Sequence, residues 1–226
     1  MANVTGENAE AVSSYMTAIW NNFDDGSKSL EYYADVITAL GAATAASSEE
    51  IAGGLEKFAA IGETIGLSYE YATAALTTIV AETRQSEDVV GTALKTIFAR
   101  IQGLKLGETL DDGTDLNKYS TALASIGVNI KDTSGNLKDM DIILDEVGVK
   151  WKTLARDEQM ALAQTVAGVR QYTQFVALMD NYQDIFKNNL SIAQNSEGAL
   201  QEQQDIYAES WEAASKRAQA ATENIY

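Results

Sequence analysis

Apolar residues in the first half of the chain recur every three or four positions, which is the spacing of amphipathic helices. Capping residues mark several helix starts: Ser47 and Glu50 form the S-x-x-E pattern of a capping box, and Ser68 and Ser86 can cap the next two helices. Gly66 fits a left-handed helix stop. The pattern predicts helices over residues 7–23, 29–46, 47–65, 68–84 and 86–103.

The same spacing identifies the residues expected to face the core. In the helix predicted over 86–103 these are Val90, Leu94, Ile97 and Ile101. Gly53 and Gly54 fall inside the helix predicted over 47–65, without the spacing of a phosphate-binding loop and without a preceding strand. We therefore expect these two glycines to permit close packing of a neighbouring helix or a bend.

The stretch "IGVNIKDTSGNLKDMDIILDEV", residues 126–147, departs from the helical spacing. Two short extended pieces, 128–131 and 136–138, surround the polar turn 132–135, so a β-hairpin is predicted over about 128–138. Val128 and Ile130 would point to one side of it and be buried against helices. Further helices are predicted over 114–126, 139–150, 157–168 and 170–186.

The last part of the chain has the most regular pattern. From Leu190 to Ile225, mostly apolar residues follow one another at alternating spacings of three and four, a heptad series with Glu197 and Gln204 as polar exceptions. This predicts one long amphipathic helix over 189–226, after a helical core module over 1–188. The residues expected to pack against a partner helix are Leu200, Tyr207, Trp211, Ala214, Ala218 and Ile225. Because the pattern still runs at Tyr226, we expect the helix to continue in a longer parent protein.

The predicted fold class is mainly α: a multi-helix domain with one short β-hairpin and a long C-terminal amphipathic helix. Composition agrees, since 46% of the 226 residues are hydrophobic and none is proline, a residue that costs about 3 kcal/mol inside a helix. The chain also lacks histidine and cysteine, which removes the commonest general base, zinc ligands and nucleophilic triads. We therefore expect no enzyme, no cofactor and no metal site.

The net charge of −17 further restricts the partners. Phosphate contacts need basic residues, so tight nucleic-acid binding is not expected. No window reaches the ~18–20 apolar residues of a membrane-spanning helix, so no membrane segment is expected either.

Two acidic turns, 111–117 and 132–136, could be interpreted as calcium loops. Neither has the spacing of an EF-hand, and Asp, Asn, Ser and Gly also form ordinary turns. An enzyme that uses carboxylates alone remains an alternative; hydrolysis of peptidoglycan that one Asp or Glu change abolishes would support it.

The order of these segments resembles the core region of phage tail tape measure proteins, of the type found in siphophage-like tails and prophages of Gram-positive bacteria. The resemblance is carried by "MTAIWNNF" (16–23), by residues 33–107 with "SSEEIAGGLEKFA", "GLSYEYATAAL" and "VVGTALKTIFARI", by "LASIGVNIKDTSGNLKDMDIILDEV" (123–147), and by "YAESWEAASKRAQAATENIY" (207–226). Tape measure proteins of this type are several times longer, so this chain would be one module of the rod.

The resemblance implies a structural function in tail assembly and tail-length determination, with the rod filling the tail tube until DNA ejection. It also implies the partners: the tail tube protein, tail assembly chaperones, and a baseplate hub or tail tip protein. The chain would be located in the virion tail, and in the host cytoplasm during assembly. The alternative is a stand-alone interaction module that self-associates through its C-terminal helix. Light scattering of the chain and of a version ending near Asn195 distinguishes the two.

Overall fold

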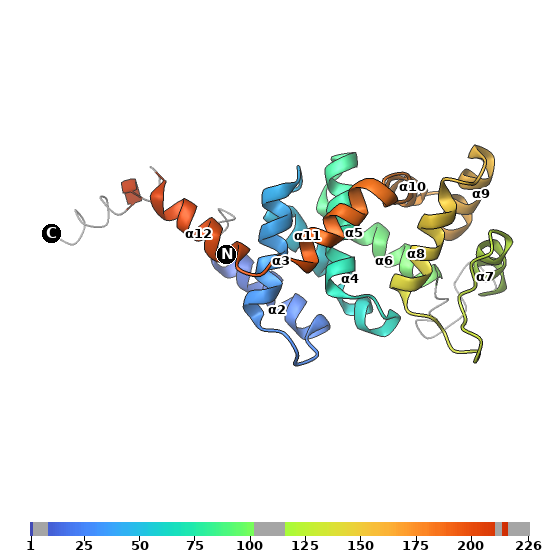
Figure 1. Ribbon diagram of the computed structural model, residues 1–226, viewed down its shortest axis with the longest axis horizontal. Helices are drawn as coiled ribbons and strands as arrows, with labels where there is room; N and C mark the ends of the chain where they lie inside the picture. Colours follow the sequence, from blue (N-terminus) through green and yellow to red (C-terminus); the bar gives the residue numbers. More distant parts are fainter. Residues whose placement is uncertain (2–8, 102–115, 211–213, 217–226) are drawn as a thin grey trace.

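The structure is a computed structural model that describes residues 1, 9–101, 116–210 and 214–216. These residues are mainly helical. The elements are α2 (Ala9–Phe23), α3 (Leu30–Ala43), α4 (Ser48–Gly62), the 3₁₀ turn η1 (Glu63–Ile65), α5 (Tyr69–Thr83), α6 (Glu87–Ile101), α7 (Leu116–Ser125), α8 (Met140–Trp151), α9 (Arg156–Ala167), α10 (Tyr172–Asp180), the π-helical turn η2 (Tyr182–Phe186), α11 (Lys187–Gln194) and α12 (Ala199–Glu209). They form an elongated body with α12 at one end and α7 and α9 at the other (Figure 1).

Helix α5 is the centre of the body. It contacts α3, α4, α6, α10, α11 and η2, and all its residues from Tyr71 to Val80 are buried. A helix covered on every side has no polar face, so its buried threonines need hydrogen-bond partners within the protein, and of the three only the Thr77 hydroxyl has none among the described residues. Thr73 and Thr78 donate to the carbonyl oxygens of Tyr69 and Ala74, at 2.6 and 2.7 Å. The chain is thus built around one small-residue helix.

Most of the predicted helix boundaries are confirmed. The Ser47–Glu50 capping box is present, with reciprocal hydrogen bonds of 2.8 and 3.1 Å. Ser68 caps α5 by accepting from the backbone N–H of Tyr71, and α6 begins directly after Ser86. Gly66 has the predicted left-handed backbone, with φ of +61°. The predicted core stripe of α6 is buried at all four positions.

Gly54 has the packing role predicted for the glycine pair. A Cβ on Gly91 of α6 would overlap the carbonyl oxygen of Gly54 in α4, and a Cβ on Gly54 would overlap the side chain of Leu76. The backbones of α4 and α6 therefore approach each other at a distance that only glycine permits.

The predicted hairpin is not formed as a pair of strands. The described residues contain no strand, and the segment has one antiparallel bridge, between Lys131 and Leu137. The Asp132 carboxylate accepts hydrogen bonds from the backbone N–H groups of Ser134 and Asn136, and the Gly135 N–H bonds to the Asp132 carbonyl oxygen. The backbone pairing beside this turn ends after one bridge, which is too short for two strands. Val128 is buried and Ile130 half-buried, as expected. The acidic turn 111–117 lies mostly outside the described residues.

The single long C-terminal helix is not confirmed. Helix α11 ends at Gln194, residues 195–198 form a turn with Gly198 at φ of +83°, and α12 then runs to Glu209. Ser210 has extended backbone. Within the described residues, the heptad spacing therefore spans two helices separated by a sharp turn, because a glycine in the left-handed region interrupts helical backbone.

Candidate interaction surface

The start of α12 is held by a buried carboxylate from the other half of the chain. Asp35 of α3 is 4% exposed and accepts hydrogen bonds from the backbone N–H groups of Gly198, at 3.0 Å, and Leu200, at 2.8 Å. The first N–H groups of a helix have no partner within it, and a carboxylate also suits the positive end of the helix dipole. Asp35 therefore determines where α12 leaves the body.

The six residues of the predicted partner face have different positions. Leu200 is half-buried and packs against the core, and Tyr207 is half-buried beside Lys216, whose Nζ lies 3.2 Å from the phenol oxygen. Ala214 is exposed. The remaining three, Trp211, Ala218 and Ile225, lie outside the described residues. On α12 itself Ile206 is 56% exposed and no residue is fully buried.

An apolar groove of about 640 Å³ lies beside the start of α12, and we refer to it as the α2–α3 groove. One stripe of α2 lines its length: Ala9, Val12, Ser13, Met16, Thr17 and Trp20. The rest of the lining comes from Leu30, Glu31 and Ala34 of α3, Leu200 of α12, and Met1. Leu30 is 49% exposed there. The groove is thus an open, helix-lined surface formed where the N-terminal helices meet the departing C-terminal helix.

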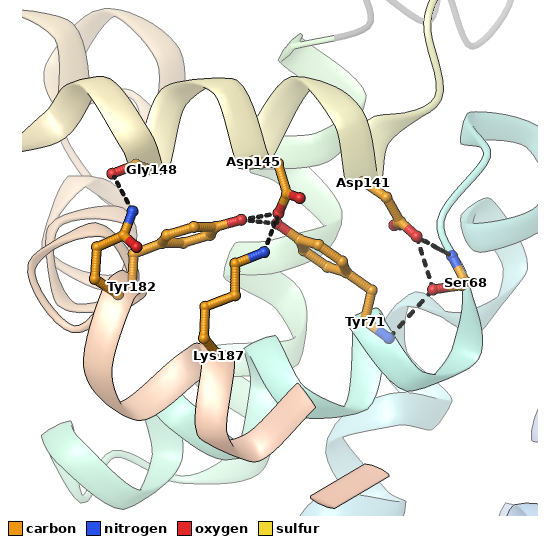
Figure 2. Close-up of polar contacts among 8 residues, drawn as sticks. Ser68, Tyr71, Asp141, Asp145, Gly148, Tyr182 and Lys187 are labelled. Carbon is orange, nitrogen blue, oxygen red and sulfur yellow. Dashed lines mark hydrogen bonds and ion pairs between the residues drawn. The ribbon is translucent and has the colours of Figure 1, made fainter. Parts of the chain in front are cut away.

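A polar junction joins α8 to α5 and α11 (Figure 2). The Asp145 carboxylate of α8 accepts hydrogen bonds from the phenols of Tyr71 and Tyr182, and pairs with the Lys187 ammonium at 2.8 Å. The two phenol oxygens lie 2.9 Å apart. Burial, and then the nearby Asp145 charge, raise the pKa of Tyr71, so this phenol stays a neutral donor.

The π-helical turn makes this junction possible. In η2 the backbone N–H of Phe186 bonds to the carbonyl oxygen of Asn181, five residues earlier. The Tyr182 ring stacks on Phe186 and lies against Gly148, where a Cβ would overlap it. The extra residue of a π-turn rotates the following side chains. Tyr182 and Lys187 are thereby able to reach the same carboxylate.

An acidic cleft of about 530 Å³ lies beside this junction. Its walls carry the carboxyl groups of Asp24, Asp25, Glu70, Asp139 and Asp141. Within the part of the chain that the structure describes, no group of three or more acidic side chains is arranged to hold a metal ion. Asp141 accepts hydrogen bonds from the N–H and hydroxyl of Ser68, the latter at 2.7 Å, and burial raises the pKa of its carboxyl to about 6. Asp141 thus joins α8 to the start of α5, whereas Asp24 and Asp25 accept hydrogen bonds within their own turn.

Residues 1–168, out of 226, match the family described as phage-related minor tail protein. The chain belongs to the phage-related minor tail protein family. This matched region contains α2 to α9 and therefore most of the body, including Asp35 and nearly all of the groove. No solved structure matches the chain. Helices α10 to α12 follow the matched region.

As a minor tail protein, the chain is a structural protein of the phage tail. Among the described residues, no helix has both the length and the apolar character needed to cross a membrane.

Several residues of this minor tail protein could not be identified from the sequence. Asp35 and Gly198 are 163 positions apart, and no local pattern connects them. Asp145 is one of many carboxylates in an acidic chain, and only the fold brings Tyr71 and Lys187 to it. The sequence did contain a signal for the groove. The apolar and small residues of the 7–23 helix recur at helical spacing over more than one face, which indicates a second packing face.

Proposed function

We propose that this chain is a structural module of a phage tail tape measure protein, acting in tail assembly and in the determination of tail length, and occupying the lumen of the tail tube until DNA ejection. The observation that carries the proposal is the position of the family match. It covers the body up to Gly168, and the heptad-spaced segment that resembles the start of a rod follows it. The body would be a compact module at one place on that rod.

The physical properties of the chain support this proposal. Helical rods gain ~1.5 Å per residue, so residue number converts directly into length. The net charge of −17 keeps such a module from binding the genome that passes through the same tube. Helix α12 projects from one end of the elongated body, which is the geometry of a module that continues into a rod (Figure 1).

The proposed partners are the tail tube protein, the tail assembly chaperones, and a baseplate hub or tail tip protein, with assembly in the host cytoplasm. We propose no catalytic role. Self-association through the C-terminal segment stays a second candidate, favoured by the exposure of Ile206 on a helix without a buried residue.

Tail length tests the proposal in a phage or prophage that carries this gene. Insertion of about 70 heptad-patterned helical residues after Lys216 should lengthen the tail by ~105 Å, measured by negative-stain electron microscopy. As a control, the same residues are inserted between Ser134 and Gly135, in the exposed turn of the body, where they should leave tail length unchanged. Tails of normal length from both insertions would show that the chain does not measure the tail.

A further inference from the structure

The α2–α3 groove has a shape that can accommodate one helix. Its α2 stripe repeats at positions 9, 12, 13, 16, 17 and 20, the a/d-like spacing that packs against a neighbouring helix over about three turns. Helix α2 already packs against α4 through Tyr15 and Phe23, which lie beside Gly53 and Gly62 of α4 and do not line the groove. The stripe is therefore an additional packing face that is exposed in part: Ala9, Ser13 and Thr17 are exposed, Val12 and Trp20 are half-buried, and Met16 is buried.

The side chains of the groove suit close approach of a helix backbone. Ala9, Ser13 and Thr17 are small and exposed, whereas Val12, Trp20 and Leu30 are larger and keep apolar surface accessible; Met16 and Ala34 are already buried. Small positions leave room for a backbone, and large positions supply apolar area to bury. Methionine also adapts to differing partner side chains.

The charge around the groove selects the partner. The three helices that form it, α2, α3 and α12, contain six carboxyl groups, of which only that of Asp35 is buried, and no lysine or arginine. Met1 also lines the groove and brings the N-terminal amino group, so the exposed carboxylates outnumber this cation. Glu31 lines the groove, and Glu10 is exposed on the first turn of α2. The nearest basic residue in sequence, Lys28, lies over the Tyr32 ring and lines the acidic cleft instead. The surroundings therefore attract cationic side chains and repel anionic ones.

This charge also argues against a second copy of the chain as the occupant. The most exposed helix of the body, α12, carries Glu202, Asp205 and Glu209 and no basic residue. Placing it in the groove of another copy would bring its three carboxylates near Glu10 and Glu31, and Lys216 beside Tyr207 would offset this repulsion only in part.

We propose that the α2–α3 groove is a docking site for an amphipathic helix of another protein, with a small apolar stripe bordered by lysine or arginine. The inference goes beyond the tail-length function and is tested separately, because binding is measured with the purified chain and tail length with the phage.

The test uses two amidated peptides of about 18 residues, a helix of ~27 Å, with the same leucine and alanine stripe. In one peptide lysine borders the stripe, and in the other glutamate does; both residues favour helices. Fluorescence anisotropy of the labelled peptides measures binding to the full 226-residue chain. The lysine peptide should bind about tenfold more tightly than the glutamate peptide, and added salt should reduce the difference.

Two neighbouring serines supply matched variants. Ser13 lines the groove and Ser14 does not, yet both are exposed on α2, so neither change should disturb folding. Ser13→Lys should weaken binding of the lysine peptide about tenfold, because the new ammonium group would be buried in the apolar groove when the peptide binds and would repel the lysines of the peptide. Ser14→Lys should leave it within about twofold.

Three results would overturn the proposal. The first is equal affinity for the two peptides, and the second is equal loss of affinity in the two serine variants. The third is a dimer of the chain, seen by sedimentation equilibrium, that Ser13→Lys dissociates and Ser14→Lys does not, since a second copy would then be the occupant.

Discussion

Asp141 and Asp145 are the same type of residue, one turn apart on α8, and their surroundings differ. Asp145 has two phenols and an ammonium group as partners, whereas the hydrogen bonds described for Asp141 all come from Ser68. A half-buried carboxylate with few donors loses hydration without full compensation, which is why the pKa of Asp141 is raised to about 6. The raised pKa of Asp141 therefore comes from its surroundings and not from its residue type.

The raised pKa of Asp141 predicts a pH-dependent contribution to stability. The folded chain takes up this proton at about pH 6 and the unfolded chain at about 3.8, so the native state binds more protons between these values and gains stability as pH falls. Relative to Asp141→Asn, the wild type should gain up to about 3 kcal/mol between about pH 7 and pH 4. Urea unfolding followed by circular dichroism at several pH values measures the difference.

Asp132→Asn is the control, with the opposite sign. Backbone hydrogen bonds to the exposed Asp132 lower its pKa, so its contribution is present above the unfolded value and is lost as pH falls. Relative to Asp132→Asn, the wild type should lose stability on acidification. If the two comparisons gave the same trend, the assignment of the acid-stabilised group to Asp141 would be wrong.

At the scale of elements, the close packing of α4 on α6 depends on glycine, which has no side chain to separate the helices. A Cβ on Gly91 would push the two backbones apart, and a Cβ on Gly54 would overlap Leu76 of α5. The ion pair between Lys57 and Asp88 spans the same contact at 2.9 Å, but both side chains are well exposed, and water and salt screen such pairs so that they contribute little. Backbone proximity and the apolar burial beneath it, with Leu94 and Ile97 inaccessible, hold these helices together.

Gly91→Ala should therefore destabilise the body, although alanine favours helices. Its methyl group would meet the Gly54 carbonyl oxygen and force α4 and α6 apart, at a cost of about 1–3 kcal/mol for an overpacked contact. Thermal and urea denaturation measure this loss. Thr92→Ala, at an exposed position one residue further along α6, should be neutral or slightly stabilising. Equal stability of Gly91→Ala and Thr92→Ala would mean that the two helices do not depend on close approach.

At the scale of the whole molecule, the decisive contact is the one between α3 and the start of α12. Asp35 caps α12 from the opposite half of the chain, Leu200 packs beside the groove, and α12 extends away from the body (Figure 1). The same short stretch thus sets the direction of the C-terminal helix and completes one wall of the groove. A change at Asp35 should alter both features without unfolding the centre of the body.

Asp35→Asn tests this separation. Asparagine offers one acceptor oxygen, so one of the two bonded N–H groups is left without its partner, at a cost of about 1–3 kcal/mol in a buried site. Hydrogen exchange followed by mass spectrometry should show faster exchange in α12 and unchanged protection in α5. The exposed change Asp205→Asn, on α12 itself, should affect neither helix. Loss of protection in α5 as well would show that Asp35 supports the whole fold.

Features that depend on neighbours within about four residues could be predicted from the sequence. The Ser47–Glu50 capping box, the cap at Ser68, the left-handed Gly66 and the buried stripe of α6 all follow from local hydrogen bonds and helical spacing. The polar turn at Asp132 was also correctly predicted, but the strands beside it were not, since one bridge and one side chain close the turn. The acidic net charge followed from composition, and the high helix content followed from hydrophobic spacing and the absence of proline.

Only the tertiary structure decided the features that join distant residues. Heptad spacing continues through Glu197, yet the chain turns there because Gly198 adopts a left-handed backbone and Asp35 begins a new helix. Helix α5 is buried on all sides because its small residues admit helices from both halves of the chain. Periodicity reports which residues avoid water, whereas the partner of each residue depends on packing between segments that the sequence does not place side by side.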